Sequence, residues 1–183
     1  MNFEQQATSR RRRPLRRTAV SLLTAIALLA VLAVVASATT VSGSSREGFA
    51  VSGEPGQVNH IRADFANNAI RVQDFRADIR TTDCFRRGSR DVSCSYRAPL
   101  SIAANDRDDR ITVRLGCCAV KVAAGSGNDR IQLKSARSRT NTVSVHLRDG
   151  QRDHVTCGNS KRVRLAVVSR DSRDDIDNCP RRR

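Results

Sequence analysis

An aspartate placed two residues before an aliphatic residue recurs along the second half of the chain, and it is the side chain whose spacing points most clearly to chemistry. The position is occupied by Asp109, Asp129, Asp153 and Asp174, separated by 20, 24 and 21 residues. A carboxylate is the hard, charged oxygen ligand that calcium prefers. A repeat of this length is typical of stacked structures, in which each unit covers its apolar face by packing on the next.

The second of these aspartates belongs to the most specific motif in the chain. Residues 124–132 read A-G-S-G-N-D-R-I-Q and match the calcium-turn pattern G-G-x-G-x-D-x-U-x, with U a large aliphatic residue, at every position but the first. Gly125 and Gly127 give the backbone the positive-φ freedom of a tight turn that directs carbonyl oxygens inward. On these residues the chain resembles the secreted hemolysin-type calcium-binding repeat proteins. The resemblance implies a parallel β-roll with calcium held between turns one coil apart.

The other copies of the motif depart from the pattern. Arg107 stands where the second invariant glycine belongs, the third copy keeps only Gly150, and a further turn carries Lys161 in place of the ligand aspartate. Two interpretations follow: weak calcium sites, or degenerate turns that are purely structural and held by hydrogen bonds and Arg–Asp pairs. The candidate metal-site residues implied by the resemblance are Asp129, Gly125, Gly127, Asn128, Asp109, Asp153 and Asp174.

The N-terminus has the features of an export signal. An arginine-rich start precedes an uncharged run from Thr18 to Thr40, and Ala36-Ser37-Ala38 supplies an A-x-A site. These features predict a signal peptide over residues 1–38, cleaved after Ala38. The apolar run has about 20 residues and is long enough to span a bilayer, so an uncleaved signal anchor is the alternative and the only predicted contact with a membrane. In both cases we expect a secreted or cell-surface protein of a bacterium.

Composition and periodicity divide the exported part into four segments. Residues 39–56 are rich in Ser and Gly and are interpreted as a linker running into the fold, with Phe49-Ala50-Val51 as a candidate for a first short strand. Residues 57–99 are predicted to form an N-terminal β cap, because apolar residues alternate on either side of Asn67-Asn68 as in an antiparallel hairpin. Apolar residues at period two over residues 100–179, with Ile111, Ile131 and Val155 among those predicted to point inward, predict an all-β fold, a parallel β-roll or β-solenoid of about four short coils. Residues 180–183 are a basic tail.

Six cysteines on an exported chain predict disulfides. Cys84 and Cys94 bracket a short polar loop, so we expect them to be bonded. Cys157 and Cys179 are separated by 22 residues, about one coil, and stacking would bring their backbones within reach of a bond. Two alternatives remain for Cys117 and Cys118: they form a vicinal disulfide, or Cys118 is a buried thiol. The sequence contains no C-x-x-C pair, which argues against a cysteine zinc site.

The chain is strongly basic, with 33 Lys and Arg against 18 Asp and Glu. Without residues 1–38 it retains 27 basic and 17 acidic residues, a net charge of +10. This charge favours a second hypothesis, a cell-envelope module that binds polyanions such as teichoic acid, acidic polysaccharide or nucleic acid. The absence of Trp and the single Tyr argue against sequence-specific recognition of bases. No G-x-S-x-G, H-E-x-x-H or Walker motif occurs, so we expect no enzymatic activity.

Overall fold

The structure, a computed structural model, describes residues 38–66, 68–95, 98–116, 118–135, 141–158 and 163–180. All of them belong to one structural unit, Ala36–Arg183. The predicted export signal therefore lies outside the described residues except for Ala38, which begins the first strand, and only Pro180 of the predicted tail is described. Across these ranges the chain is all-β, and none of it is a helix of the length and apolarity needed to cross a membrane.

The strands of the described residues form two sheets. The seven-stranded sheet has the order β14 (Val163–Ser169), β12 (Asn141–His146), β10 (Val120–Ala123), β8 (Leu100–Ala103), β2 (Gly48–Ser52), β1 (Ala38–Ser44), β5 (Asp78–Thr81). The eight-stranded sheet has the order β15 (Asp175–Asp177), β13 (His154–Gly158), β11 (Arg130–Ser135), β9 (Arg110–Leu115), β3 (His60–Ala66), β4 (Ala69–Asp74), β7 (Asp91–Ser95), β6 (Phe85–Gly88).

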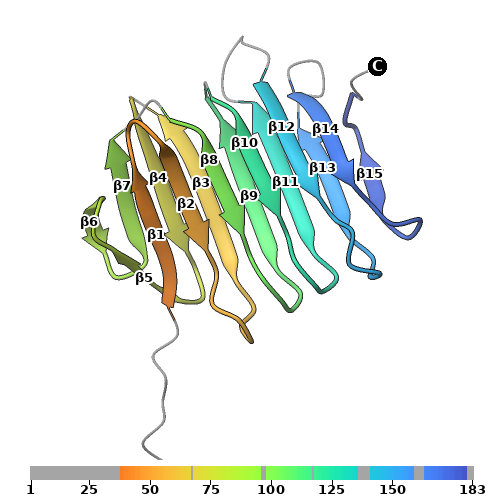
Figure 1. Cartoon of the computed structure of the whole chain (residues 1–183), viewed down its shortest axis with the longest axis horizontal. Coiled ribbons are helices and arrows are strands. Elements are labelled where there is room, and N and C mark those ends of the chain that lie inside the picture. Colours follow the sequence, from red (N-terminus) through yellow and green to blue (C-terminus); the bar gives the residue numbers. More distant parts are fainter. Residues whose placement is uncertain are drawn as a thin grey trace, which may run out of the picture. The chain divides into compact units, whose positions relative to one another are not determined.

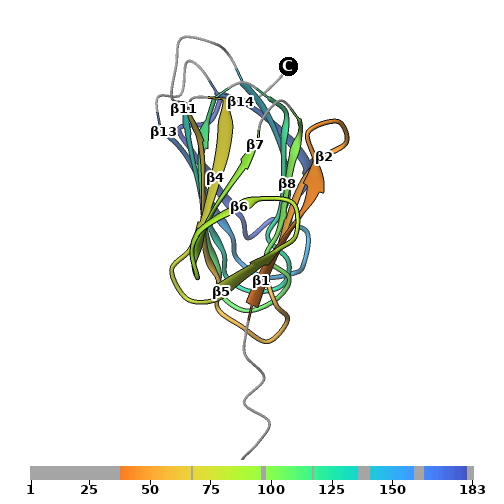
Figure 2. The same ribbon diagram turned by 90° about the vertical axis from the view of Figure 1, so that its left-hand side faces the viewer.

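The chain builds this unit by alternating between the two sheets. Five successive strand pairs, β2/β3, β8/β9, β10/β11, β12/β13 and β14/β15, place one strand in each sheet, and we call them tiers. Every tier pairs in parallel with the next one on both sheets. Figure 1 shows the tiers side by side, and Figure 2 shows the two sheets facing each other. The all-β prediction with parallel strands is therefore confirmed.

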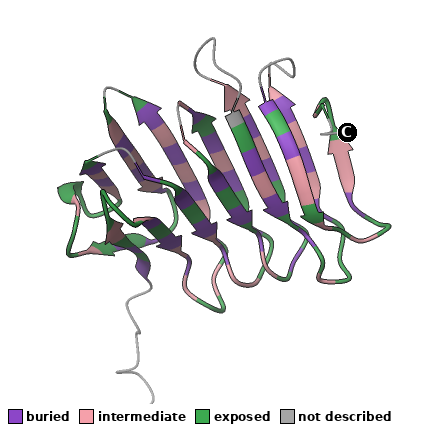
Figure 3. Cartoon of the chain, turned by 45° about the horizontal axis from the view of Figure 1, so that its top comes forward, coloured by how far each residue is buried: buried purple, intermediate pink, exposed green. Residues whose placement is uncertain are grey.

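The interior between the sheets is filled by the inward half of each strand. Ile111, Ile131 and Val155 are register partners on neighbouring strands and are at most 1% exposed. The same alternation of buried and more exposed residues runs along the other strands (Figure 3). Burying one such side chain stabilises the fold by about 1.5–3 kcal/mol. The residues predicted to point inward are buried throughout β9 to β13, which confirms the period-two assignment.

The N-terminal region agrees with the sequence in one part and differs in another. The predicted hairpin is present as β3 and β4, with Asn68 at φ 59° in its turn. The prediction of a linker over residues 39–56 is wrong, because this segment contains β1 and β2, and the candidate strand at residues 49–51 is part of β2. These strands pair with each other, and β2 also pairs with β8. The glycines there serve close packing, since a Cβ on Gly43 would lie 2.1 Å from the carbonyl oxygen of Gly48.

Two disulfides predicted from spacing are present. Cys84 is bonded to Cys94 with the Cα atoms 4.4 Å apart, and Cys157 is bonded to Cys179 with the Cα atoms 4.9 Å apart. Cys118 is also disulfide-bonded, so the alternative of a buried thiol is wrong, while Cys117 lies outside the described residues. The second bond joins the end of the chain to β13 in the preceding tier.

Candidate functional site

The four repeated aspartates lie in a line along the side of the eight-stranded sheet at which β9, β11, β13 and β15 begin. Each is the last residue of a turn and immediately precedes β9, β11, β13 or β15, so parallel pairing brings them onto neighbouring strands. Their exposed fractions are small: 2% for Asp109, 1% for Asp129, 0% for Asp153 and 9% for Asp174. The structure therefore brings these candidate residues together, but in the interior and not on the surface.

Their carboxylates bind the backbone of the preceding tier. The N–H of Asp109 donates to Oδ1 of Asp129 at 2.7 Å, the N–H of Asp129 to Oδ1 of Asp153 at 2.9 Å, and the N–H of Asp153 to Oδ1 of Asp174 at 3.1 Å. Hydrogen bonds to an ionised acceptor are stronger than neutral ones. This series, together with Asn59 before it, is called the Asp ladder below, and it ties each tier to the next.

Asn59 is the first member of the ladder, and the search for repeated aspartates missed it. Its N–H donates to Oδ1 of Asp109 at 2.5 Å. Its amide Nδ2 donates to the carbonyl oxygens of Ala104 at 3.0 Å and Gln57 at 3.1 Å. The signal was present in the sequence, because Asn59 stands two residues before Ile61, with the same spacing to an aliphatic residue as the aspartates.

The second oxygen of three ladder carboxylates has no hydrogen-bond partner within the part of the chain that the structure describes. Oδ2 of Asp109, Asp129 and Asp153 is buried and accepts no hydrogen bond from the described residues. Removal from water raises the pKa of Asp109 to about 7, of Asp129 to about 6 and of Asp153 to about 7. Neighbouring aspartates add to this rise by repulsion between like charges. Each of these oxygens is a place where a proton or a cation would relieve an unfavourable charge.

The two motif glycines are required because the backbones of neighbouring turns touch. Gly125 has φ 98° and Gly127 has φ 140°. A Cβ on Gly125 would lie 1.9 Å from the carbonyl oxygen of Asn105, and one on Gly127 would lie 2.0 Å from that of Arg107. Asn105 and Arg107 adopt the same kind of backbone, with φ 79° and 74°. Arg107 therefore departs from the sequence pattern and still keeps the shape of the turn.

Other acidic residues of the turns, which the sequence analysis did not select, also bind backbone amides. The N–H of Asn128 donates to Oδ1 of Asp108 at 2.8 Å, and the N–H of Gly127 donates to Oδ2 of Asp149 at 3.0 Å. Oδ1 of Asn128 accepts a bond from the N–H of Arg152 at 3.3 Å. Asn128, a candidate ligand, thus links three successive turns. A pattern of aspartates alone does not reveal which amide each carboxylate will meet.

The fit of a calcium ion can be judged from the donors at this edge. Within the described residues no group of three or more His, Cys, Asp or Glu side chains is arranged to hold a metal ion. The oxygens that fit calcium chemically are the unpaired Oδ2 atoms of the ladder and the carbonyls of the turns. Comparison with protein-family models, with curated proteins and with solved structures finds no match to this chain.

Proposed function

We propose that the exported part of this chain is a non-enzymatic β-roll related to the calcium-repeat proteins, in which the Asp turns are mainly structural. The observation that carries the proposal is the Asp ladder, in which carboxylates of one tier bind the amides of the tier before it. The ladder stabilises the stack with one hydrogen bond between each pair of successive tiers, in addition to the apolar packing between the sheets. A scaffold of this kind leaves the outer faces of both sheets free to contact a partner.

The burial of the ladder supports a non-catalytic role. Its aspartates are at most 9% exposed, so a substrate in solution would not reach their carboxylates. A general acid or base must lie within hydrogen-bond reach of the group from which it takes a proton or to which it gives one. The raised pKa values at these positions then reflect burial within the scaffold and not acid–base catalysis.

Weak calcium binding at the same turns is the second candidate function. It is favoured by the unpaired Oδ2 atoms of Asp109, Asp129 and Asp153. These carboxylates, with carbonyls of Gly125 and Gly127, would hold the ion, whose charge would offset the repulsion among them. We expect a dissociation constant on the order of 0.1–1 mM, because few carboxylates are gathered at each turn. Exposed arginines on the same turns, Arg107, Arg152 and Arg173, also lower the affinity for a cation.

Thermal unfolding of the oxidised chain distinguishes the two functions. A structural ladder predicts the same unfolding temperature in EDTA and in about 5 mM calcium. A calcium site predicts a gain on the order of 1–2 kcal/mol in calcium, which magnesium does not reproduce. Near pH 4.5, where the Asp129 carboxyl of the folded chain is largely protonated, Asp129→Ala should lose about 1–3 kcal/mol even without calcium, because it leaves the buried N–H of Asp109 without an acceptor.

The control variant is Asp78→Ala, since Asp78 has a side chain 60% exposed and pairs with Arg90 only at 3.5 Å. It should change stability by less than about 0.5 kcal/mol. If Asp129→Ala is as stable as the control near pH 4.5 without calcium, the structural role of the ladder is wrong. If calcium still stabilises the Asp129→Ala variant, the ion binds elsewhere and not at this turn.

A further inference from the structure

The outer face of the eight-stranded sheet carries a group of cations at its centre. Arg62 of β3, Arg110 and Arg114 of β9, and Arg130 and Lys134 of β11 all lie at outward positions of strands whose alternate residues are buried. We call these five residues the cationic face. Asp64 is the one acidic residue at an outward position on the same three strands.

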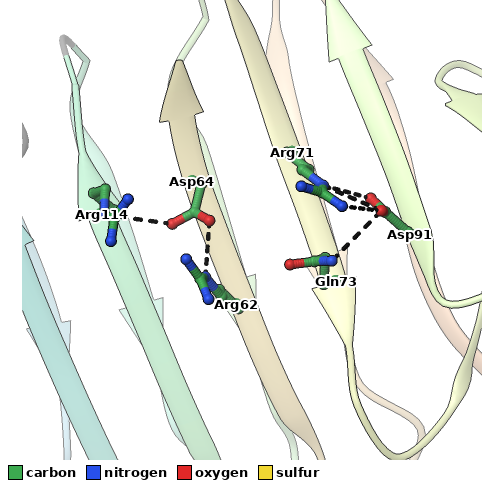
Figure 4. A network of polar contacts seen from close by, with 6 residues as sticks. All are labelled: Arg62, Asp64, Arg71, Gln73, Asp91 and Arg114. Carbon is green, nitrogen blue, oxygen red and sulfur yellow. Dashed lines mark hydrogen bonds and ion pairs between the residues drawn. The ribbon is translucent and has the colours of Figure 1, made fainter. Parts of the chain in front are cut away.

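Ion pairs neutralise the cations on one side of this face. Figure 4 shows Arg71 and Gln73 of β4 bound to Asp91 of β7, with Nε of Arg71 at 2.9 Å from Oδ1 of Asp91. Asp64 accepts a hydrogen bond from Arg62 at 2.8 Å and lies 3.9 Å from Arg114. The charge of Arg62 is therefore largely balanced, and that of Arg114 is balanced more weakly.

The opposite side is neutralised as well. Arg152 pairs with Asp175 at 2.6 Å, and His154 lies 3.7 Å from Asp177. At the centre of the face, Arg110, Arg130 and Lys134 make no ion pair or side-chain hydrogen bond with any described residue. Positive potential is thus concentrated on β9 and β11, where it can attract an anionic partner.

The register of the strands arranges four of these cations in two rows, with Arg62 in the row between them. Arg110 pairs with Arg130, and Arg114 with Lys134, on neighbouring strands about 4.8 Å apart. The two rows are separated by four residues along the strand, roughly 13 Å. Between them lie Thr112 and Gln132, whose hydroxyl and amide groups can exchange hydrogen bonds with a polar ligand.

A shallow hollow of about 320 Å³ opens on this face and has an aromatic wall. Four of the five cations line it, all but Arg130, together with Asp64, Thr112, Gln132, His60 and Phe75. The Phe75 side chain is 47% exposed, and its ring centroid lies 4.9 Å from that of His60. A half-exposed ring beside unpaired cations suits a ligand that has both an apolar surface and anionic groups.

We propose that the cationic face binds an acidic polysaccharide across β3, β9 and β11. Arginine holds carboxylate or sulfate groups in bidentate geometry. The polar row between the cations meets the sugar hydroxyls, and the Phe75 ring packs against a sugar ring. This inference extends the proposed scaffold by assigning one of its free faces to a partner, and it concerns residues other than the Asp ladder.

The outer face of the other sheet supports the assignment, because it is different in character. The row of register partners that crosses it reads Ala50, Ser101, Lys121, Ser144 and Ala166. That row carries a single cation among small residues. Over their whole length β2, β8, β10, β12 and β14 carry two cations, Lys121 and Arg164, against five on β3, β9 and β11, so an anionic chain has a preferred side to bind.

Nucleic acid is the main competing polyanion, and the face is poorly built for it. Binding of single strands relies on aromatic side chains that stack on successive bases. Phe75 and His60 lie side by side as a single aromatic contact and the hollow offers no further ring, so a series of bases has nothing to stack on. The row of Thr112 and Gln132 matches the hydroxyl-rich surface of a sugar chain better than a stack of bases.

The test measures binding of the oxidised full chain to polygalacturonate by affinity electrophoresis at low and high salt. Neutral dextran and duplex DNA serve as comparison ligands. Polygalacturonate should slow the protein at low salt, and the effect should weaken steeply as salt rises, because binding releases counterions. Dextran should have no effect. If DNA slows the protein as strongly as polygalacturonate does, selectivity for polysaccharide is wrong; if polygalacturonate has no effect, the binding proposal is wrong.

Matched double variants locate the site. Arg110→Gln with Arg130→Gln should weaken polygalacturonate binding on the order of tenfold, because two charge-assisted contacts are lost. Lys121→Gln with Arg164→Gln removes the same charge from exposed positions of the seven-stranded sheet and should change the affinity by less than about twofold. Equal losses from both pairs would show attraction by net charge alone and would overturn the inference.

Stability measurements keep this test separate from that of the scaffold. All four substituted residues are exposed, so the unfolding temperature of both double variants should match that of the parent. If the arginine pair nevertheless destabilises the chain, Lys134→Gln is used in its place and is expected to weaken binding several-fold. Failure of binding with a stable ladder overturns only the cationic face, whereas failure of the Asp129→Ala test overturns only the ladder.

Discussion

Replacing Asp129 with asparagine should stabilise the protein at high pH and flatten its response to pH. The substitution keeps an oxygen to accept the N–H of Asp109 and removes the charge of a carboxylate that is 1% exposed. Asn59 already shows how an asparagine fits this position, with Nδ2 donating to the carbonyl two residues earlier and to a carbonyl of the next tier. By strand register, the acceptors that correspond to these for an asparagine at position 129 would be the carbonyls of Gly127 and Leu147.

The magnitude follows from the raised pKa. Burial raises the pKa of Asp129 from 3.8 to about 6, so the folded chain retains a proton that the unfolded chain releases. A raised carboxyl pKa contributes stability that is full below about pH 4 and is lost as the pH rises through about 6. A shift of about two units corresponds to an effect on the order of 3 kcal/mol at pH 8. We therefore expect Asp129→Asn to gain on the order of 1–3 kcal/mol at pH 8 and only about a third of that gain near pH 4.5.

Urea unfolding at several pH values between about 4.5 and 8, in EDTA, measures this difference. The parent should lose stability as the pH rises, because Asp109 and Asp153 also have raised pKa values of about 7. The variant should lose less, since removing the charge of Asp129 also relieves the repulsion that raises those two pKa values. Below about pH 4 both proteins should weaken, because Asp91 and Asp175 have lowered pKa values from hydrogen bonds to arginine.

The converse substitution, Asn59→Asp, is the control. It places a carboxylate where Nδ2 now donates to two carbonyls, so it should destabilise the chain at pH 8 and steepen the pH dependence. The reasoning is refuted if Asp129→Asn has the same pH dependence as the parent, or if it is less stable than the parent at pH 8. Either result would mean that the charged carboxylate is stabilised by something other than the amide of Asp109.

Two further substitutions test the turns. Gly127→Ala should destabilise the chain by on the order of 3 kcal/mol or more, because the added Cβ would lie 2.0 Å from a carbonyl oxygen. The Cβ of Gly150→Ala would have nothing within 4 Å, so this variant should lose only about 1–2 kcal/mol through backbone strain at φ 84°. Equal losses of stability in chemical denaturation would show that glycine is required at position 127 because of backbone strain and not because of contact between turns. Arg107→Gly should raise stability by about 0.5–1 kcal/mol, since relief of strain at φ 74° exceeds the entropy that glycine adds to the unfolded chain. A loss of stability in the same assay would mean that the Arg107 side chain contributes more than its backbone strain.

Local patterns in the sequence predicted much of this structure because they report which way a side chain points. In a strand, parity alone decides the inward face, and the predicted rows through Ile111, Ile131 and Val155 are buried for that reason. The repeat spacing placed the aspartates at equivalent positions of successive strands, which predicts a common edge. The bonds of Cys84 to Cys94 and of Cys157 to Cys179 followed from the same kinds of spacing.

Composition was misleading where small residues had a packing role. Residues 39–56 have the Ser and Gly content of a linker, yet they form β1 and β2. Val41, Phe49 and Val51 are at most 3% exposed in those strands. The glycines between them permit a backbone approach that no other residue would allow. Composition cannot distinguish a glycine required for close packing from a glycine in a flexible linker, because the contact that requires it comes from a neighbouring strand.

Only the tertiary structure decided what the aspartates and arginines contact. The sequence placed Asp129 at a turn with a carboxylate suited to calcium, but stacking directs one of its oxygens to the amide of Asp109 and leaves the other unpaired. It likewise revealed a basic chain without showing that Arg110 and Arg130 would be neighbours. Both results depend on the register between strands about 20 residues apart, and that register is set by packing of the whole core and not by the residues near each site.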